Sequence, residues 1–265
     1  MRFVRLYYTY VLYFFKSRME YRTSFILGIL SNFYCYFITF ITFGVIVKNF
    51  GSIDGWKYNE MCILYSLNLL GYAIAGMVFW GVLGIEKEII EGRLDAYLTK
   101  PMGVIQQIVC KNFADTFIGQ VIVAAVFFVI AIHNMQIEWS LVRIGFMLIS
   151  ILGSFLLHSG AMVFFGALSF WIKRSLPLAD LLYFDFKNFI QYPISIFPKF
   201  IRFVLTFVLP WAICNYYPSL IILNKADTDY EYILGLFSPL IGGICFTLAI
   251  FVFRKGLNKY NGSGS

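Results

Sequence analysis

Residues 61–84 read MCILYSLNLLGYAIAGMVFWGVLG, and residues 88–103, just after them, read EIIEGRLDAYLTKPMG. The first stretch contains no charged side chain, whereas the second contains five. About 20 consecutive apolar residues in a helix are enough to cross the hydrocarbon of a bilayer. The first stretch therefore predicts a membrane-spanning helix, and the second predicts a polar connection outside the hydrocarbon.

The composition of the whole chain extends this prediction. Of the 265 residues, 60% are hydrophobic and only 13% are charged, and the mean hydropathy is +0.77. Soluble domains carry about 25% charged residues. The five cysteines are widely spaced without a C-x-x-C pair, which indicates buried small residues and neither a disulfide nor a metal site. The fold class predicted is an all-α integral membrane protein.

Six apolar stretches come close to the length of a membrane span. They are residues 24–47, 61–84, 114–132, 141–172, 200–223 and 233–253. The fourth is long enough to tilt, or to kink near Gly153 and Gly160. We therefore expect six transmembrane helices within residues 24–258. The tail, residues 259–265, ends in a Gly/Ser run at 261–265 that resembles a cloning linker.

Residues 1–23 have a different pattern from the stretches that follow. Apolar and aromatic side chains recur there at helical spacing, with basic residues on the other faces. The apolar positions are Phe3, Leu6, Tyr7, Tyr10 and Phe14. This pattern predicts an N-terminal amphipathic helix that lies at the membrane interface. The plainer alternative is a positively charged flank that only anchors the first span.

The positions of lysine and arginine predict the orientation in the membrane. With both termini in the cytoplasm, the segments on the inner side hold 17 basic residues and the outer loops hold three. The three outer residues are Lys48, Lys57 and Lys225. Cytoplasmic loops carry an excess of basic residues in membrane proteins. The net charge of +7 is therefore explained mostly by topology, and it is poor support for nucleic-acid binding.

Residues 173–200 allow two topologies. The polar residues and prolines that interrupt this segment are Asp180, Asp185, Lys187, Pro193 and Pro198. The first interpretation, which we prefer, places the segment on the cytoplasmic side before a span at 200–223. The second makes 177–197 the fifth span and 200–223 a re-entrant hairpin on the outer side. The charge rule favours the first, because the second puts Lys199 and Arg202 outside.

Residues 86–101 predict one short amphipathic helix on the cytoplasmic side. The apolar stripe consists of Ile85, Ile89, Ile90, Leu94, Tyr97 and Leu98, and Glu86, Lys87, Glu88, Glu91, Arg93 and Asp95 lie mainly on the other faces. Gly92 in its middle favours a close approach of another surface or a bend, and Pro101 ends the helix. Such a helix either rests on the bilayer as an ordinary loop or transmits force from a soluble partner to the spans.

Sequence motifs for catalysis are missing from the chain. There is no G-x-x-x-x-G-K-[ST] phosphate loop, no H-E-x-x-H and no G-x-S-x-G. We therefore expect no enzymatic activity in this chain, and energy for any transport would come from a partner. His158 lies in the middle of a span, where an ionisable residue is a functional hypothesis by default. The alternative is a histidine that bonds to a neighbouring helix.

Two motifs carry a resemblance to a known family. The pattern E-x-x-x-G-x-L-D-x-x-L-x-K-P resembles the loop after the second span of ABC-2 type permeases. Its members here are Glu88, Gly92, Leu94, Asp95, Leu98, Lys100 and Pro101. The sequence QYPISIFPKFIRFVLTFVLPWAICNYYPSLIIL at 191–223 is similar to a bacterial branch of six-span permeases of about 260 residues. The resemblance covers residues 1–258.

The resemblance implies that residues 86–101 form a coupling helix that docks into a separate ABC ATPase. The docking residues carried over are Glu88, Ile89, Glu91, Gly92, Arg93, Leu94, Asp95, Tyr97, Leu98, Lys100 and Pro101. ATP and Mg would be bound by that ATPase subunit, and this chain would bind no cofactor and no metal. A second permease chain, identical or paralogous, would complete the transporter. The location implied is the bacterial cytoplasmic membrane.

Three functions follow as hypotheses. The first is the permease subunit of an ABC exporter for an apolar or amphiphilic molecule, with Asn68, Gln120 and His158 as candidates for the substrate path. The second is a non-transporting membrane anchor or sensor for a cytoplasmic complex, which transport across vesicles would distinguish from the first. The third is a lipid-modifying enzyme with Asp180, Asp185 and Lys187 as its site, which would act without an ATPase.

The preferred topology departs from the family in one respect. Other ABC-2 permeases often have an outer re-entrant hairpin between the last two spans, which the preferred topology lacks.

Overall fold

A computed structural model describes residues 2–135, 137, 140–172 and 174–260 of the chain. The predicted linker, residues 261–265, lies outside these described residues, as do the side chains of residues 2–5. Within the described part, the regular structure is helical, apart from one isolated bridge between Ile53 and Trp56. The predicted all-α class is therefore confirmed for the described part of the chain.

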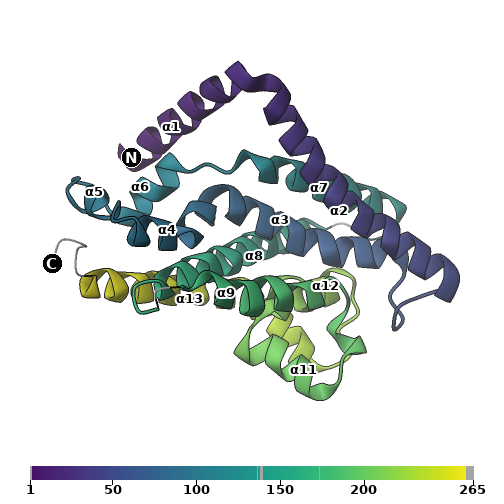
Figure 1. The fold of residues 1–265 in the computed structure, drawn as a ribbon. Coiled ribbons are helices and arrows are strands. Elements are labelled where there is room, and N and C mark those ends of the chain that lie inside the picture. The colour runs from purple at the N-terminus through teal and green to yellow at the C-terminus, as the bar shows by residue number, and fades with distance from the viewer. Residues whose placement is uncertain (1, 136, 138–139, 173, 261–265) are drawn as a thin grey trace.

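The long helices account for five of the six apolar stretches. They are α2 (Arg22–Phe50), α3 (Tyr58–Leu83), α7 (Ile118–Asn134), α8 (Leu141–Leu168) and α13 (Asp229–Lys259). Each lies in a helical segment long and apolar enough to cross a membrane. Before them comes α1 (Arg2–Arg18), which meets α2 at a sharp corner in Figure 1 through a 3-10 turn, Met19–Tyr21.

Shorter helices fill the connections between these long ones. They are α4 (Ile85–Ile90), α5 (Asp95–Leu98), α6 (Val104–Lys111), α9 (Leu176–Ala179), α10 (Phe186–Phe189), α11 (Lys199–Phe203) and α12 (Tyr216–Ile222). The segments Asp180–Asp185 and Val204–Val208 are π-helical, and Asp115–Phe117, Ile194–Ile196 and Trp211–Cys214 are 3-10 turns. In Figure 1, both ends of the chain lie at the same end of the bundle as α4, α5 and α6.

Helix α3 lies at the centre of the bundle. Its residues are apolar on nearly every face, and all but a few positions between Met61 and Ala75 are buried. A helix that is hydrophobic all round is stable only when neighbours cover every face. Helices α7 and α8 pack along α3, and α13 packs along the far side of α8. The stretch quoted first therefore forms the core around which the other helices assemble.

Helices α8 and α13 approach so closely that their backbones touch. A Cβ atom on Gly242 would lie 2.2 Å from the carbonyl oxygen of Gly153, and one on Gly153 would lie 2.5 Å from Cα of Pro239. Helix α8 runs without a break from Leu141 to Leu168, and the tilt or kink near Gly153 and Gly160 stays a prediction. Small residues in membrane proteins commonly allow such close helix contacts.

The span predicted at 200–223 is not one straight helix. The helical segments 199–208 and 211–222 meet at a bend of 70°. Leu209 and Pro210 lie at the bend, where proline cannot donate the hydrogen bond that would continue the helix. The segment therefore folds as a bent hairpin, visible below α12 in Figure 1.

Both ends of this hairpin lie beside the loop that joins α2 to α3. Before the hairpin, Ile196 and Phe197 share a groove with Ile53. After it, the Nζ of Lys225 donates to the carbonyl of Gly55 at 3.0 Å and lies 2.6 Å from Glu60. The chain thus leaves and returns at one end of the bundle, which is the geometry of the second topology.

Arg202, one of the two basic residues to which the charge rule was applied here, makes local backbone contacts. Its guanidinium donates to the backbone carbonyls of Phe197, at 2.7 Å, and Ser195. These carbonyls belong to the turn before α11, so the arginine closes that turn. Which side of the membrane Arg202 faces stays a prediction.

The hairpin predicts the result of a labelling experiment. Cysteines introduced at Lys199 and Lys57 should react with a membrane-impermeant maleimide from the same side of sealed vesicles, in a background without native cysteines. A cysteine at Lys87 should react only from the opposite side. If the cysteines at Lys199 and Lys87 react from the same side, the re-entrant hairpin is contradicted and residues 200–223 cross the membrane.

The contact between α8 and α13 predicts a difference between two adjacent glycines. Gly242→Ala should lower the thermal midpoint of the detergent-solubilised protein, because overpacking of this kind typically costs about 1–3 kcal/mol. Gly243→Ala is the matched control, since a Cβ there meets only Leu156, at 4.0 Å. Equal midpoints for the two variants would show that the contact is not tight.

Candidate functional site

Residues 85–111, here called the docking element, consist of three short helices and not of one. The predicted continuous helix over 86–101 is wrong, because α4 ends at Ile90 and α5 begins at Asp95. Gly92 between them has φ of +68°, a left-handed conformation that side chains other than glycine rarely adopt. Helix α5 ends at Leu98, before Pro101, as proline predicts.

The residues of the predicted apolar stripe are divided between two surfaces, with members on both sides of Gly92 in each. Leu94 and Tyr97 are buried, together with Ile85, and hold the element against the bundle. Ile90 and Leu98 point outward instead, with 61% and 48% of their surface exposed. These two side chains fit either predicted role of the segment, contact with the bilayer or contact with a soluble partner.

The charged residues of the docking element form a compact group around Arg93. The guanidinium donates two hydrogen bonds to the carboxylate of Glu88, at 3.0 and 3.1 Å, and also contacts Glu91. Hydrogen bonding from Arg93 lowers the pKa of Glu88 from 4.5. The pair therefore contributes its stabilisation above pH 4.5 and loses it as the pH falls further.

The other predicted docking residues lie around this group. Glu91, Lys100 and Pro101 are exposed, Asp95 is half-buried, and Ile89 is half-buried against the core. Gln107 of α6 closes the element from the inside by donating to the carbonyls of Tyr97 and Met102. The exposed members are therefore concentrated on the side facing away from the bundle.

Glu86 is a structural residue that the sequence pattern placed on the polar face. It is 8% exposed, and its carboxylate accepts hydrogen bonds from the backbone N–H groups of Ser175 and Leu176 at 2.6 and 2.8 Å. The hydroxyl of Ser175 donates to the same oxygen at 3.2 Å. Glu86 thus caps the N-terminus of α9 and joins the docking element to the segment that follows α8.

The N-terminal helix α1 is fastened to the same end of the bundle. Arg18 pairs with the buried Asp115 at 3.0 Å, and the rings of Phe14 and Phe15 contact Phe113. Of the predicted apolar positions, Tyr7 and Phe14 are half-buried, while Leu6 and Tyr10 are exposed. Whether α1 lies at the membrane interface stays a prediction.

The three residues predicted to line a substrate path do not gather in one place. His158 lies in the core with Asn68 at 3.0 Å and the hydroxyl of Tyr183 at 3.1 Å. Gln120 is elsewhere, and donates to Asn32 of α2 at 3.0 Å. All three predicted residues are buried and join helices to one another, so the described cavities do not include them.

The three residues of the enzyme hypothesis also face different surroundings. Lys187 is buried, with its ammonium 3.2 Å from the centre of the Tyr72 ring, which is a cation–π contact. Asp180 and Asp185 are exposed. Among the described residues, Lys187 forms no salt bridge with either carboxylate. No group of three potential metal ligands occurs among the described residues.

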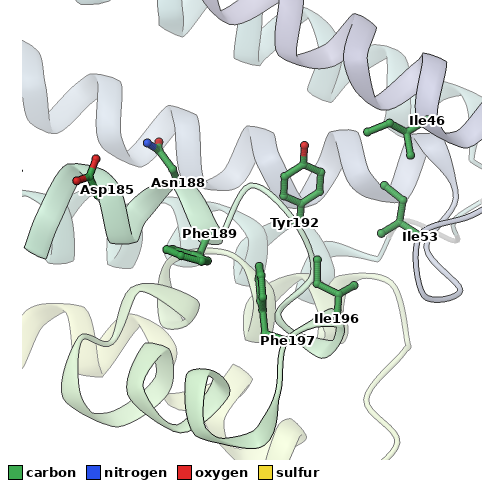
Figure 2. A pocket seen from close by; sticks show the side chains of 8 residues that line it. All are labelled: Ile46, Ile53, Asp185, Asn188, Phe189, Tyr192, Ile196 and Phe197. Carbon is green, nitrogen blue, oxygen red and sulfur yellow. The ribbon is translucent and has the colours of Figure 1, made fainter. Parts of the chain in front are cut away.

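A groove of about 550 Å³ runs between α2 and the segment around α10. Figure 2 shows Asp185 and Asn188 at one end of it and Ile46 and Ile53 at the other. The remaining lining residues are Phe189, Tyr192, Ile196 and Phe197. The groove is therefore mostly apolar with polar groups at one end, and the sequence analysis did not single it out.

The comparison with known proteins identifies the family. The model for the ABC-2 family transporter protein matches residues 33–264, which include the docking element, the groove and the hairpin. The chain belongs to the ABC-2 transporter family, a class of membrane permeases that function with ABC ATPase subunits. No curated protein and no solved structure matches the chain significantly.

The cap on α9 predicts the effect of removing the Glu86 carboxylate. Glu86→Ala should lower the thermal midpoint of the purified protein, because two buried N–H groups lose a charged acceptor worth about 1.5–3 kcal/mol. Glu91→Ala is the matched control, since Glu91 is exposed. A midpoint for Glu86→Ala equal to that of Glu91→Ala would show that the cap contributes nothing.

Proposed function

We propose that this chain is the membrane subunit of an ABC exporter that couples ATP hydrolysis by a separate ATPase to movement of an apolar or amphiphilic molecule. ATP and Mg would be bound by the ATPase. The proposal depends mainly on the docking element. Members of the ABC-2 family function with ABC ATPase subunits, and we propose this element as the contact for the ATPase. The docking element is exposed on its outer side and fixed on its inner side.

The fixed side of the docking element supports a mechanical role. Leu94 and Tyr97 pack into the bundle, and Glu86 bonds to the start of α9. Helix α4 continues from α3 after a break at Gly84. A displacement of the docking element would therefore move both the central helix and the segment from α9 onward, and these are the elements a transport cycle would have to rearrange.

The proposed topology has six crossings with both termini in the bacterial cytoplasm. The crossings are α2, α3, α7, α8, residues 176–197 and α13, and residues 199–222 form a hairpin that enters from the outer side. Both termini and the docking element lie at one end of the bundle in Figure 1, as an even number of crossings requires. Helix α1 would lie in the inner interface.

The groove between α2 and α10 is the proposed substrate surface. In this topology, the exposed Asp185 lies near the middle of the fifth crossing, where a carboxylate facing lipid would cost several kcal/mol. We therefore expect this face to be covered by a second permease chain and to line the path. Apolar walls with Asp185 and Asn188 at one end suit an amphiphile that carries a hydrogen-bond donor.

The docking proposal predicts a specific loss of the partner. Leu98→Asp should abolish co-purification of an ABC ATPase and the vanadate-sensitive ATP turnover of the complex, because a charge would enter the apolar contact. Since Leu98 is exposed, the variant should fold normally. Leu94→Asp is unsuitable, because Leu94 is buried and the variant would disrupt the element itself.

Asn258→Asp is the matched control for this experiment. It adds the same charge at the same end of the bundle, on the exposed surface of α13, and should retain the ATPase. An ATPase that still co-purifies with the Leu98→Asp variant would contradict docking through this surface. If the ATPase co-purifies with the wild-type chain but no substrate moves across the vesicle membrane, the anchor or sensor function would be supported instead.

A further inference from the structure

A second cavity lies next to the docking element and has a different chemistry. Its volume is about 380 Å³, and the residues that line it come from α1, from the end of α5 and the loop after it, and from α6: Tyr10, Tyr97, Lys100, Pro101, Met102, Gln107, Cys110 and Lys111. Cavities of about 300–1,000 Å³ commonly hold small ligands. We refer to it as the basic cavity.

Two lysines in this cavity have no acidic partner. Among the described residues, Lys100 and Lys111 form no salt bridge. Lys111 donates to the hydroxyl of Tyr97 at 3.1 Å, and both ammonium groups lie within 6.0 Å of the Tyr97 ring. The acidic side chain that influences Lys111 is Glu88, whose carboxylate is already held by Arg93. The cavity therefore carries uncompensated positive charge.

Gln107 provides an independent sign of a ligand. Its side chain lines the cavity and is buried, with 6% exposure. The amide nitrogen donates to two backbone carbonyls, but the amide oxygen has no hydrogen-bond partner. An unpartnered buried acceptor costs about 1–3 kcal/mol unless something bonds to it. A ligand with both a negative group and a hydroxyl or ammonium donor would satisfy the lysines and Gln107 together.

The position of the cavity indicates where such a ligand comes from. One wall is α1, whose outer surface exposes Tyr8, Leu12 and Tyr13. Exposed aromatic and apolar side chains on a basic helix are typical of helices that lie among lipid head groups. The basic cavity would then open at head-group depth on the cytoplasmic side, the leaflet where anionic lipids attract lysine.

We propose that the basic cavity binds the head group of an anionic phospholipid, with Lys100 and Lys111 on the phosphate and the oxygen of Gln107 on a hydroxyl or ammonium of the head group. The proposal rests on the interfacial position of α1. A lipid bound there would join α1 to residues 97–102 and hold the exposed end of the docking element in place. The composition of the bilayer would then influence docking.

Binding is tested on the full chain alone, purified and placed in nanodiscs of phosphatidylcholine. The probe is dihexanoyl phosphatidylglycerol, detected by native mass spectrometry. The double variant Lys100→Gln/Lys111→Gln should lose affinity for the probe by about 30-fold, the factor expected when two lysines next to an anionic group are removed. The double variant Lys100→Arg/Lys111→Arg should retain it. Lys87→Gln, on the same element but outside the cavity, is the matched control.

Each outcome decides for or against the proposal. Equal binding by wild type and the glutamine variant, or equal binding of dihexanoyl phosphatidylcholine, would overturn it. Binding of inorganic phosphate as tight as that of the lipid would assign the cavity to a soluble phosphate compound instead. If the lipid does not bind to the wild type, and the ATPase no longer co-purifies with the glutamine variant, the proposal is overturned and the two lysines belong to the docking contact. The binding measurement contains no ATPase. A negative result would therefore overturn the lipid proposal without affecting the docking proposal, which the Leu98→Asp experiment tests.

Discussion

The burial of α3 on every face is the constraint on which the rest of the structure depends. Its sequence leaves no polar face, so α7 and α8 must cover it, and α13 then covers α8. The few polar groups that enter this core need partners inside the protein, since water and lipid cannot supply them. Asn68 on α3 bonds to His158 on α8, and His158 bonds in turn to Tyr183.

The same helix links the core to the docking element. At Gly84 the chain leaves α3 and begins the docking element, and within two residues Glu86 bonds to the backbone at the start of α9. Three parts of the molecule therefore meet at one point, and they are the central helix, the proposed ATPase contact and the segment that carries Asp185. This junction gives a physical route from a docked partner to the groove.

The two cavities differ in chemistry, and we propose different ligands for them. The groove beside α10 is mostly apolar with a carboxylate at one end, and it suits an amphiphile that crosses the membrane. The basic cavity contains two lysines and an unpartnered amide oxygen, and it suits a lipid head group that stays in place. Short helices with breaks between them line both the groove and the basic cavity. A continuous helix would place the polar side chains at different positions.

Apolar length and composition predicted the class of protein and most of the long helices, and two motifs predicted the family, because these depend on residues close together in the sequence. The tertiary structure decided the rest. Gly92 adopts a left-handed conformation that splits the docking element. Leu98 is exposed although Leu94, one helical turn before it, is buried. Arg202 bonds to the carbonyls of the turn before α11, a contact that a count of charges does not reveal. Glu86 could not be recognised from the sequence, because its partners lie about 90 residues away and only folding brings those N–H groups to it.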